Sequence, residues 1–125
     1  MRLKQIESVI FAVEHTKLID WYTNTLGFEV ESRVEGEYHY CVLRHSDGAR
    51  LGIADAQEMS VNPQDRLNNS VVLQFQVPNV EHFLEHVKTH GGSITFGPSY
   101  DKNDEFWYGA FQDTEGNPFW VVDDN

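Results

Sequence analysis

Hydrophobic and polar positions follow the same pattern twice along this chain. Apolar segments at residues 6–13 and 71–77 each end on valine and predict a strand. Each leads into an amphipathic segment that ends at glycine and predicts a helix, over about 16–26 and 79–90. Three more strand-like segments follow in each half: 28–35, 38–45 and 50–54, then 94–96, 106–112 and 119–122. The pattern therefore predicts the order βαβββ in two successive copies.

The last two strands of each copy are joined through a turn of the same kind, Asp47-Gly48 and Glu115-Gly116, which is typical of a hairpin. The polar segment between the copies predicts a linker. We therefore predict a single α+β domain over residues 1–125, with module one at 4–55, a linker at 56–69 and module two at 70–125. With both helices on one side, the tandem modules would form a curved mixed sheet around a central cavity.

Composition narrows the class of protein. Twenty acidic and nine basic residues give a formal net charge of −11, which disfavours nucleic acid and anionic membranes as partners. No apolar run approaches the roughly 20 residues of a membrane-spanning helix, and the first residues lack the apolar stretch of a signal peptide. A single cysteine, Cys41, excludes an intramolecular disulfide and is compatible with a reducing compartment. We expect a cytoplasmic protein.

Two segments carry a family resemblance. Residues 19–28, IDWYTNTLGF, resemble the "FY-x-x-x-LGF" helix of the vicinal oxygen chelate superfamily, with Trp21 in place of the phenylalanine. Residues 111–120, FQDTEGNPFW, resemble its "DPDGN" turn, with Thr114 and Glu115 as the departures. This superfamily includes glyoxalase I, extradiol dioxygenases and the fosfomycin and bleomycin resistance proteins. Because it hosts several chemistries and several pure binders, the resemblance implies the fold more strongly than an activity.

The resemblance also implies where a metal would be held, because enzymes of the superfamily use one ligand from the first strand and one from the last strand of each copy. Counting from the strand-end valines and the turn glycines gives Ser8, Val72, Gly52 and Trp120. None of these is a normal metal ligand. A shift of one residue in the first strand would bring in Glu7, but no small shift gives three or four ligands. We therefore expect no metal and no cofactor.

Alternation along the strands predicts the residues of the cavity face. Gln74 and Gln76 alternate with core positions, so their amides are expected to face water or a ligand, and the aromatic residues there suit a flat organic molecule. The acidic surface favours a guest that is cationic or aromatic. The predicted ligand-binding residues are Ser8, His39, Cys41, Gly52, Gln74, Gln76, Trp107, Phe111 and Trp120. No catalytic residue is predicted, and Asp101, Asp104 and Glu105 are expected in a loop over the rim, either binding a cation or simply solvated.

Three functions remain open at this point. The favoured one is metal-independent binding of a small molecule by sequestration, similar to bleomycin resistance proteins, and this resemblance implies a homodimer. The second is a metal-dependent glyoxalase- or dioxygenase-type enzyme with an atypical ligand set. The third is a structural or regulatory domain whose aromatic residues fill the cavity.

Overall fold

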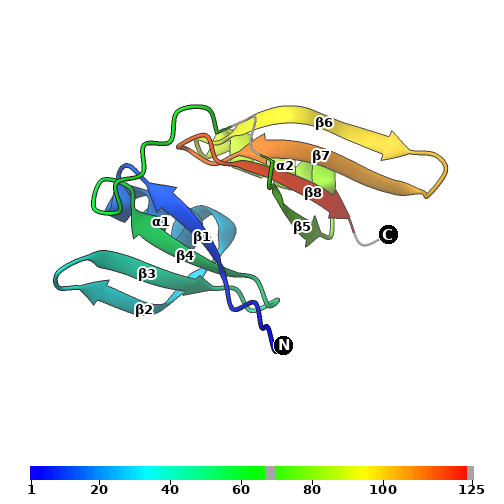
Figure 1. Ribbon diagram of the computed structural model, residues 1–125. Helices are drawn as coiled ribbons and strands as arrows, with labels where there is room; N and C mark the ends of the chain where they lie inside the picture. The colour runs from blue at the N-terminus through cyan, green and yellow to red at the C-terminus, as the bar shows by residue number, and fades with distance from the viewer. Residues whose placement is uncertain (67–69, 124–125) are drawn as a thin grey trace. The chain divides into compact units, whose positions relative to one another are not determined.

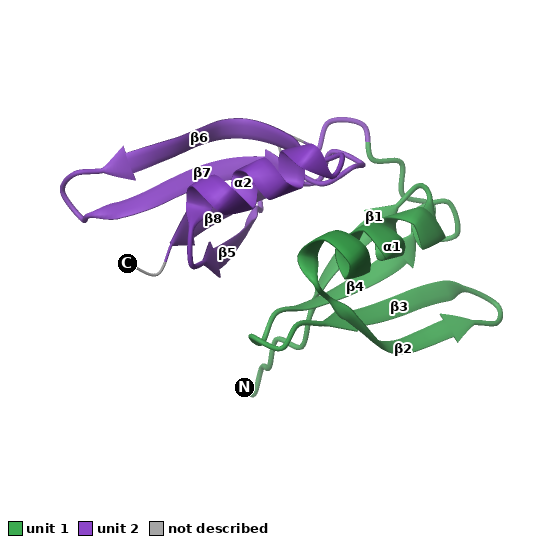
Figure 2. Ribbon diagram, turned by 180° about the vertical axis from the view of Figure 1, so that it is seen from behind, with its two compact units in different colours: residues 1–63 green, residues 64–125 purple. Residues whose placement is uncertain are grey.

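The computed structural model describes residues 1–66 and 70–123, and it divides into two compact units, residues 1–63 and 64–125 (Figure 2). Residues 67–69 of the predicted linker and residues 124–125 of the predicted module two lie outside the described residues. The first unit contains β1 (Ser8–Ala12), α1 (His15–Leu26), β2 (Glu29–Glu35), β3 (His39–Arg44) and β4 (Arg50–Asp55). The second contains β5 (Leu73–Val77), α2 (Val80–Thr89), β6 (Ser93–Asp101), β7 (Phe106–Gln112) and β8 (Pro118–Asp123). The predicted α+β fold with tandem βαβββ modules is confirmed (Figure 1).

Each unit is a four-stranded mixed sheet covered by one helix. The strand order is β1-β4-β3-β2 in the first sheet and β5-β8-β7-β6 in the second. The pairs β1–β4 and β5–β8 are parallel, and the others are antiparallel. In each unit the helix lies across one face of the sheet, so each sheet has a covered face and an open face (Figure 2).

Local sequence explains where the helices begin and end. Helix α1 ends because Gly27 adopts a left-handed conformation with φ of +79°, and its N–H donates to the carbonyl of Tyr22. Helix α2 is capped at its N-terminus by Asn79, whose side chain accepts a hydrogen bond from the His82 N–H. In the described part of the chain, neither helix is long and apolar enough to cross a membrane.

Stacked phenylalanine rings form the core between α2 and its sheet. The ring of Phe119 lies 5.2 Å from that of Phe75 and 5.1 Å from that of Phe111. Phe83 of α2 contacts Phe111 at 5.2 Å, edge to face. Phe111 is wholly buried and Phe119 is 1% exposed, so these rings fix which face of the second sheet lies under the helix.

Strand β6 is longer than the sequence predicts. The sequence predicts a strand over residues 94–96, whereas β6 spans Ser93–Asp101. Pro98 has no N–H for the ladder, and the register against β7 shifts between Phe96 and Ser99 to accommodate it. Gly97 is needed there, because it has φ of +80° and a Cβ would lie 2.9 Å from the Tyr108 carbonyl. The extended strand brings Asp101 into the sheet.

Asp113 organises the turn between β7 and β8. Its carboxylate accepts hydrogen bonds from the Glu115 N–H at 2.9 Å, and from the Asn117 N–H and side-chain amide at 2.9 and 2.7 Å. The residue is 3% exposed. Arg66 also donates to the turn through its Nη1 atom, at 3.3 Å to the Glu115 carboxylate and 3.2 Å to the side-chain oxygen of Asn117. The turn is therefore a rigid element that sets the register of the hairpin.

We predict that Asp113→Ala lowers the free energy of unfolding by about 2–3 kcal/mol, because three partly buried donors lose their acceptor. Urea denaturation monitored by circular dichroism measures this. Asp47→Ala in the first hairpin is the control, since the Asp47 side chain is 89% exposed, and its effect should stay within about 0.5 kcal/mol. Equal effects of the two substitutions would contradict the role given to Asp113.

Candidate functional site

The register of the two hairpins decides which side chains reach the open faces. Arg44 pairs with Arg50 and Gln112 with Pro118, so each loop holds five residues, 45–49 and 113–117. Gly52 therefore lies opposite Val42, and Trp120 opposite Ala110. The predicted cavity residues Cys41, Trp107 and Phe111 occupy the alternate positions of β3 and β7, so the predicted pairing is wrong by one residue in both copies. A slip of one residue reverses the faces of a strand, so the predicted faces of β3 and β7 are corrected.

On the first sheet, Ser8 and Cys41 belong to the covered face. Ser8 pairs with Leu51, and Cys41 pairs with Ile53; both partners are essentially unexposed. Cys41 itself has no exposed surface, and burial raises the pKa of its thiol. The cavity face predicted for Ser8 is therefore wrong: Ile10, on the same side of β1 as Ser8, is 6% exposed, whereas Val9 on the other side is 46% exposed. We therefore leave Ser8 and Cys41 out of the candidate site.

His39 is held at the end of the first sheet by Glu58. The carboxylate accepts the His39 backbone N–H at 2.7 Å and lies 2.5 Å from its ring Nδ1. The His39 ring also lies 6.0 Å from that of His15, at the start of α1, so it is on the helix side of the sheet. The hydrogen bond to Glu58 raises the pKa of His39, and the same pair lowers the pKa of Glu58.

The open face of the first sheet carries a hydrogen-bonded network centred on Glu7. The side chain of Glu7 is only 9% exposed; it accepts the Tyr40 hydroxyl, and it lies 3.6 Å from the Arg50 guanidinium. Arg50 in turn binds Glu31 through two hydrogen bonds of 2.6 and 2.8 Å. The hydrogen bond from Arg50 lowers the pKa of Glu31, and burial, followed by the contact with Glu7, raises that of Tyr40.

Gly52 makes room for this network. A Cβ atom at this position would lie 2.5 Å from Cζ of Tyr40 and 2.9 Å from Oε2 of Glu7. Gly52 is thus on the open face, as predicted, and the space beside it is taken by Tyr40. Tyr40 is not among the predicted site residues. A hairpin register shifted by one residue would have placed it on the same face as Gly52.

On the second sheet, the two predicted aromatic residues of β7 do not reach the open face. Phe111 lies in the core beneath α2. Trp107 lies on the same side of β7 as Phe111; its ring contacts Tyr100 at 5.3 Å, and its backbone N–H donates to the Asp123 carboxylate at 3.2 Å. The residues that take their place are Phe106, Tyr108 and Ala110, on the alternate positions of the same strand.

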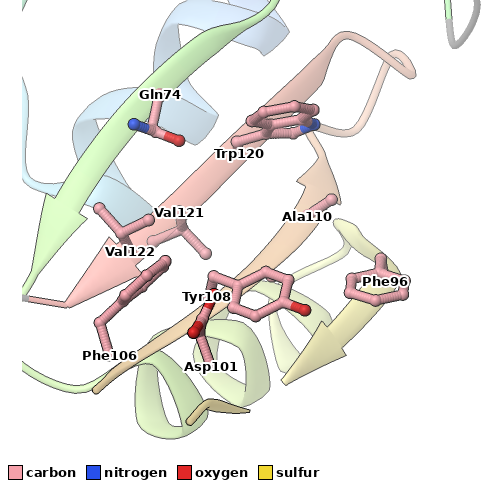
Figure 3. Close-up of a pocket in the computed structure, with 10 residues that line it drawn as sticks. Gln74, Phe96, Asp101, Phe106, Tyr108, Ala110, Trp120, Val121 and Val122 are labelled. Atoms are coloured by element: carbon pink, nitrogen blue, oxygen red, sulfur yellow. The ribbon is translucent and has the colours of Figure 1, made fainter. Parts of the chain in front are cut away.

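The open face of the second sheet holds a pocket of about 500 Å³ (Figure 3). Gln74, Trp120 and Ala110 lie side by side on β5, β8 and β7, as the ladder pairs show. The ring of Tyr108 stacks on Phe96 at 5.8 Å and contacts Phe106 at 5.6 Å. Trp120 is 57% exposed and Phe96 is 53% exposed. The lining residues are Gln74, Phe96, Asp101, Phe106, Tyr108, Gly109, Ala110, Trp120, Val121 and Val122.

The predicted residues thus divide into three groups. Gln74 and Trp120 line the pocket together, and Gln76 is exposed one row along the same face. Gly52 lies on the open face of the other unit. Ser8, His39, Cys41, Trp107 and Phe111 lie on the helix sides of their sheets. Phe96, Phe106 and Tyr108 are the pocket residues that the sequence analysis missed.

The sequence model of the Glyoxalase/Bleomycin resistance protein/Dioxygenase superfamily matches residues 2–121. The chain belongs to this superfamily. No curated protein sequence matches it.

Several solved structures of the superfamily share the fold. The fosfomycin resistance protein FosX from Listeria monocytogenes matches with a TM-score of 0.78 at 15% identity, covering 100% of this chain and 96% of that one. A superfamily member from Sphaerobacter thermophilus has a TM-score of 0.76 at 17% identity, with 98% of each chain covered. A family enzyme from Burkholderia phytofirmans has a TM-score of 0.71 at 14% identity, covering 94% and 95%. At these identities the likeness shows the fold alone.

The metal that superfamily enzymes hold does not fit the donors of this chain. The parallel pairs place Ser8 opposite Leu51 and Leu73 opposite Phe119, so Glu7, not Ser8, corresponds to Val72. The four equivalent positions are therefore Glu7, Val72, Gly52 and Trp120, which offer one carboxylate. That carboxylate is already bound by Tyr40 and Arg50. Within residues 1–66 and 70–123, no cluster of three His, Cys, Asp or Glu side chains could hold a metal ion.

We predict that Gly52→Ala lowers the free energy of unfolding by about 1–3 kcal/mol, because the added methyl displaces Tyr40 from Glu7. Urea denaturation of the single variant and of Gly52→Ala in a Tyr40→Ala background measures the coupling, and the cost should largely disappear in the double variant. Gly36→Ala is the control, since a Cβ there meets nothing within 4 Å. A cost that persists without Tyr40 would show that the tyrosine is not the obstacle.

We also predict that His39 titrates above the ordinary value of about 6.5 and that Glu58→Gln lowers its pKa, as measured by NMR. Because the folded pKa of His39 is raised, its stabilising effect is present below about pH 6.5 and is lost as pH rises through the folded value. The Glu58 contribution is lost as pH falls through its lowered pKa. The stability difference between the protein and Glu58→Gln should therefore peak in mildly acidic solution. Glu37→Gln, an exposed change of the same charge, should show no such maximum.

Proposed function

We propose that this protein binds a small, flat organic molecule in the pocket on the open face of its second sheet, without a metal. Binding is reversible and sequesters the guest, with no bond made or broken. The single observation that carries the proposal is the aromatic pocket of about 500 Å³, in which Trp120 and Phe96 are each more than half exposed and the ring of Tyr108 stacks on Phe96.

The physical support is the cost of leaving these rings in water. Large exposed apolar patches on soluble proteins mark binding surfaces, and aromatic faces favour stacking with another flat ring. The side-chain amide of Gln74, in the row beside Trp120, offers both a donor and an acceptor that would orient a polar substituent of the guest. The pocket is built on strands, so it is formed before a ligand arrives.

Metal independence is part of the same proposal, and it is supported by the donors at the superfamily's ligand positions. Gly52 and Val72 have no side-chain donor, Trp120 has only an N–H, and Glu7 is engaged by its neighbours. The name of FosX gives that protein a role in fosfomycin resistance, and a resistance-type role is part of the present proposal. Homodimerisation and a cytoplasmic location complete the proposal, and light scattering of the purified protein tests the first of these.

A second candidate is a metal-dependent glyoxalase- or dioxygenase-type enzyme with an atypical ligand set. It is favoured by Glu7, a carboxylate on an open face at a position where superfamily enzymes take a ligand. Stoichiometric Ni, Zn, Fe or Mn that copurifies with the protein, and that is lost in Glu7→Gln, would establish this candidate and overturn the metal-independent one.

We predict that neutral quinoline binds the protein in the presence of EDTA, measured by isothermal titration calorimetry, and that it changes tryptophan fluorescence. Trp120→Ala should weaken binding about tenfold, because the largest ring of the pocket is lost. Trp107→Phe is the matched control, since Trp107 lies outside the lining and should leave the affinity unchanged. Binding that needs a metal, or that survives Trp120→Ala undiminished, would contradict the proposal.

A further inference from the structure

We propose that the pocket selects planar organic cations and that Asp101 is the residue that sets this selectivity. This inference rests on the proposed function, because it concerns the charge of the guest that the same pocket accepts. Of the ten residues that line the pocket, Asp101 is the one with a formally charged side chain at neutral pH.

The lining favours positive charge by two effects that act together. Aromatic faces carry negative charge density and attract a cation, and a carboxylate at the same pocket adds a direct Coulombic attraction. The lining contains no lysine, arginine or histidine that would bind an anion or repel a cation. An anionic ring would be repelled by Asp101, with no positively charged side chain in the lining to offset this. A neutral ring would gain the stacking without the Coulombic attraction.

Backbone hydrogen bonds hold the Asp101 carboxylate in place. Its Oδ1 atom accepts the N–H groups of Asn103 at 2.8 Å and Asp104 at 3.0 Å. Its main-chain carbonyl accepts the Glu105 N–H at 2.8 Å. The residue ends β6 directly opposite Phe106, so its position is set by both the sheet ladder and the turn. A fixed carboxylate pays less conformational entropy when a ligand binds than a mobile one would.

The net charge of −11 also attracts cations, so a local effect must be separated from a general one. Asp104 lies in the same turn but outside the pocket lining, which makes it the matched control. Asp101→Asn and Asp104→Asn each remove one negative charge. Asparagine at position 101 keeps an Oδ1 acceptor for the two turn N–H groups, so the turn should be preserved, and circular dichroism checks the fold.

The experiment compares three ligands of one ring system by isothermal titration calorimetry at moderate salt: 1-methylquinolinium, quinoline and quinoline-2-carboxylate, at a pH where quinoline is neutral. We expect the cation to bind about tenfold more tightly than quinoline and the carboxylate to bind most weakly. Asp101→Asn should weaken the cation about tenfold and leave quinoline unchanged, whereas Asp104→Asn should change the cation less than twofold.

The outcomes separate the two proposals. Equal binding of the cation and quinoline, or equal losses in Asp101→Asn and Asp104→Asn, would overturn the role of Asp101 while the aromatic pocket remains a binding site. Tighter binding of quinoline-2-carboxylate would overturn the cation preference in the same way. If none of the three ligands binds, the proposed function fails, and the selectivity inference fails with it.

Discussion

The five-residue loops of the two hairpins are the constraint on which the chemistry of both sheets depends. They set β3 against β4 and β7 against β8, and thereby decide which of two alternating sets of side chains lies beneath each helix. Moving either register by one residue would expose a set such as Leu43 or Phe111, at a cost of about 1.5–3 kcal/mol for each large side chain. Asp113 fixes the second loop by accepting three hydrogen bonds while almost wholly buried. The other alternating set of side chains then forms the open face of each sheet.

The open faces of the two copies differ in chemistry. On the open face of the first sheet, the charged groups bind one another. The Glu7 carboxylate is bound by Tyr40 and Arg50, and the Arg50 guanidinium is bound by Glu31. The open face of the second sheet presents rings that lack a covering layer within their own unit, with Trp120 and Phe96 each more than half exposed. One copy thus has few free hydrogen-bonding groups and the other has free apolar surface. A duplicated backbone supports both, since strand alternation constrains only the covered side.

The order of elements and most of their bounds could be predicted from the sequence because glycine stops and apolar periodicity are strong local signals. The faces could not be predicted reliably. In β1 both alternate sets are apolar, Ile10 and Ala12 against Val9 and Phe11, so alternation gives no preference. In β3 and β7 the face depends on loop length, which a turn motif fixes only to within a residue. Alternation predicts the face of Gln74 and Trp120, because each of them neighbours a core phenylalanine along its strand. It does not predict the pocket face of Phe96 and Tyr108, which depends on the full length of β6 and on the hairpin register.

Gly52 and Trp120 occupy equivalent positions of the two copies, and their sizes are opposite for a physical reason. Glycine at 52 is required because Tyr40, from the neighbouring strand, fills the space above it and donates to Glu7. At Trp120 the neighbouring strand offers Ala110, whose methyl leaves the space open for a large ring. The large side chain of each pair therefore comes from a different strand. In the first copy it is Tyr40 on β3, and in the second it is Trp120 on β8. Neither position offers a side-chain atom that normally binds a metal, and a metal needs several such donors at once. Opposite choices of side chain at equivalent positions therefore cover the first open face with a tyrosine and leave the second with an exposed tryptophan.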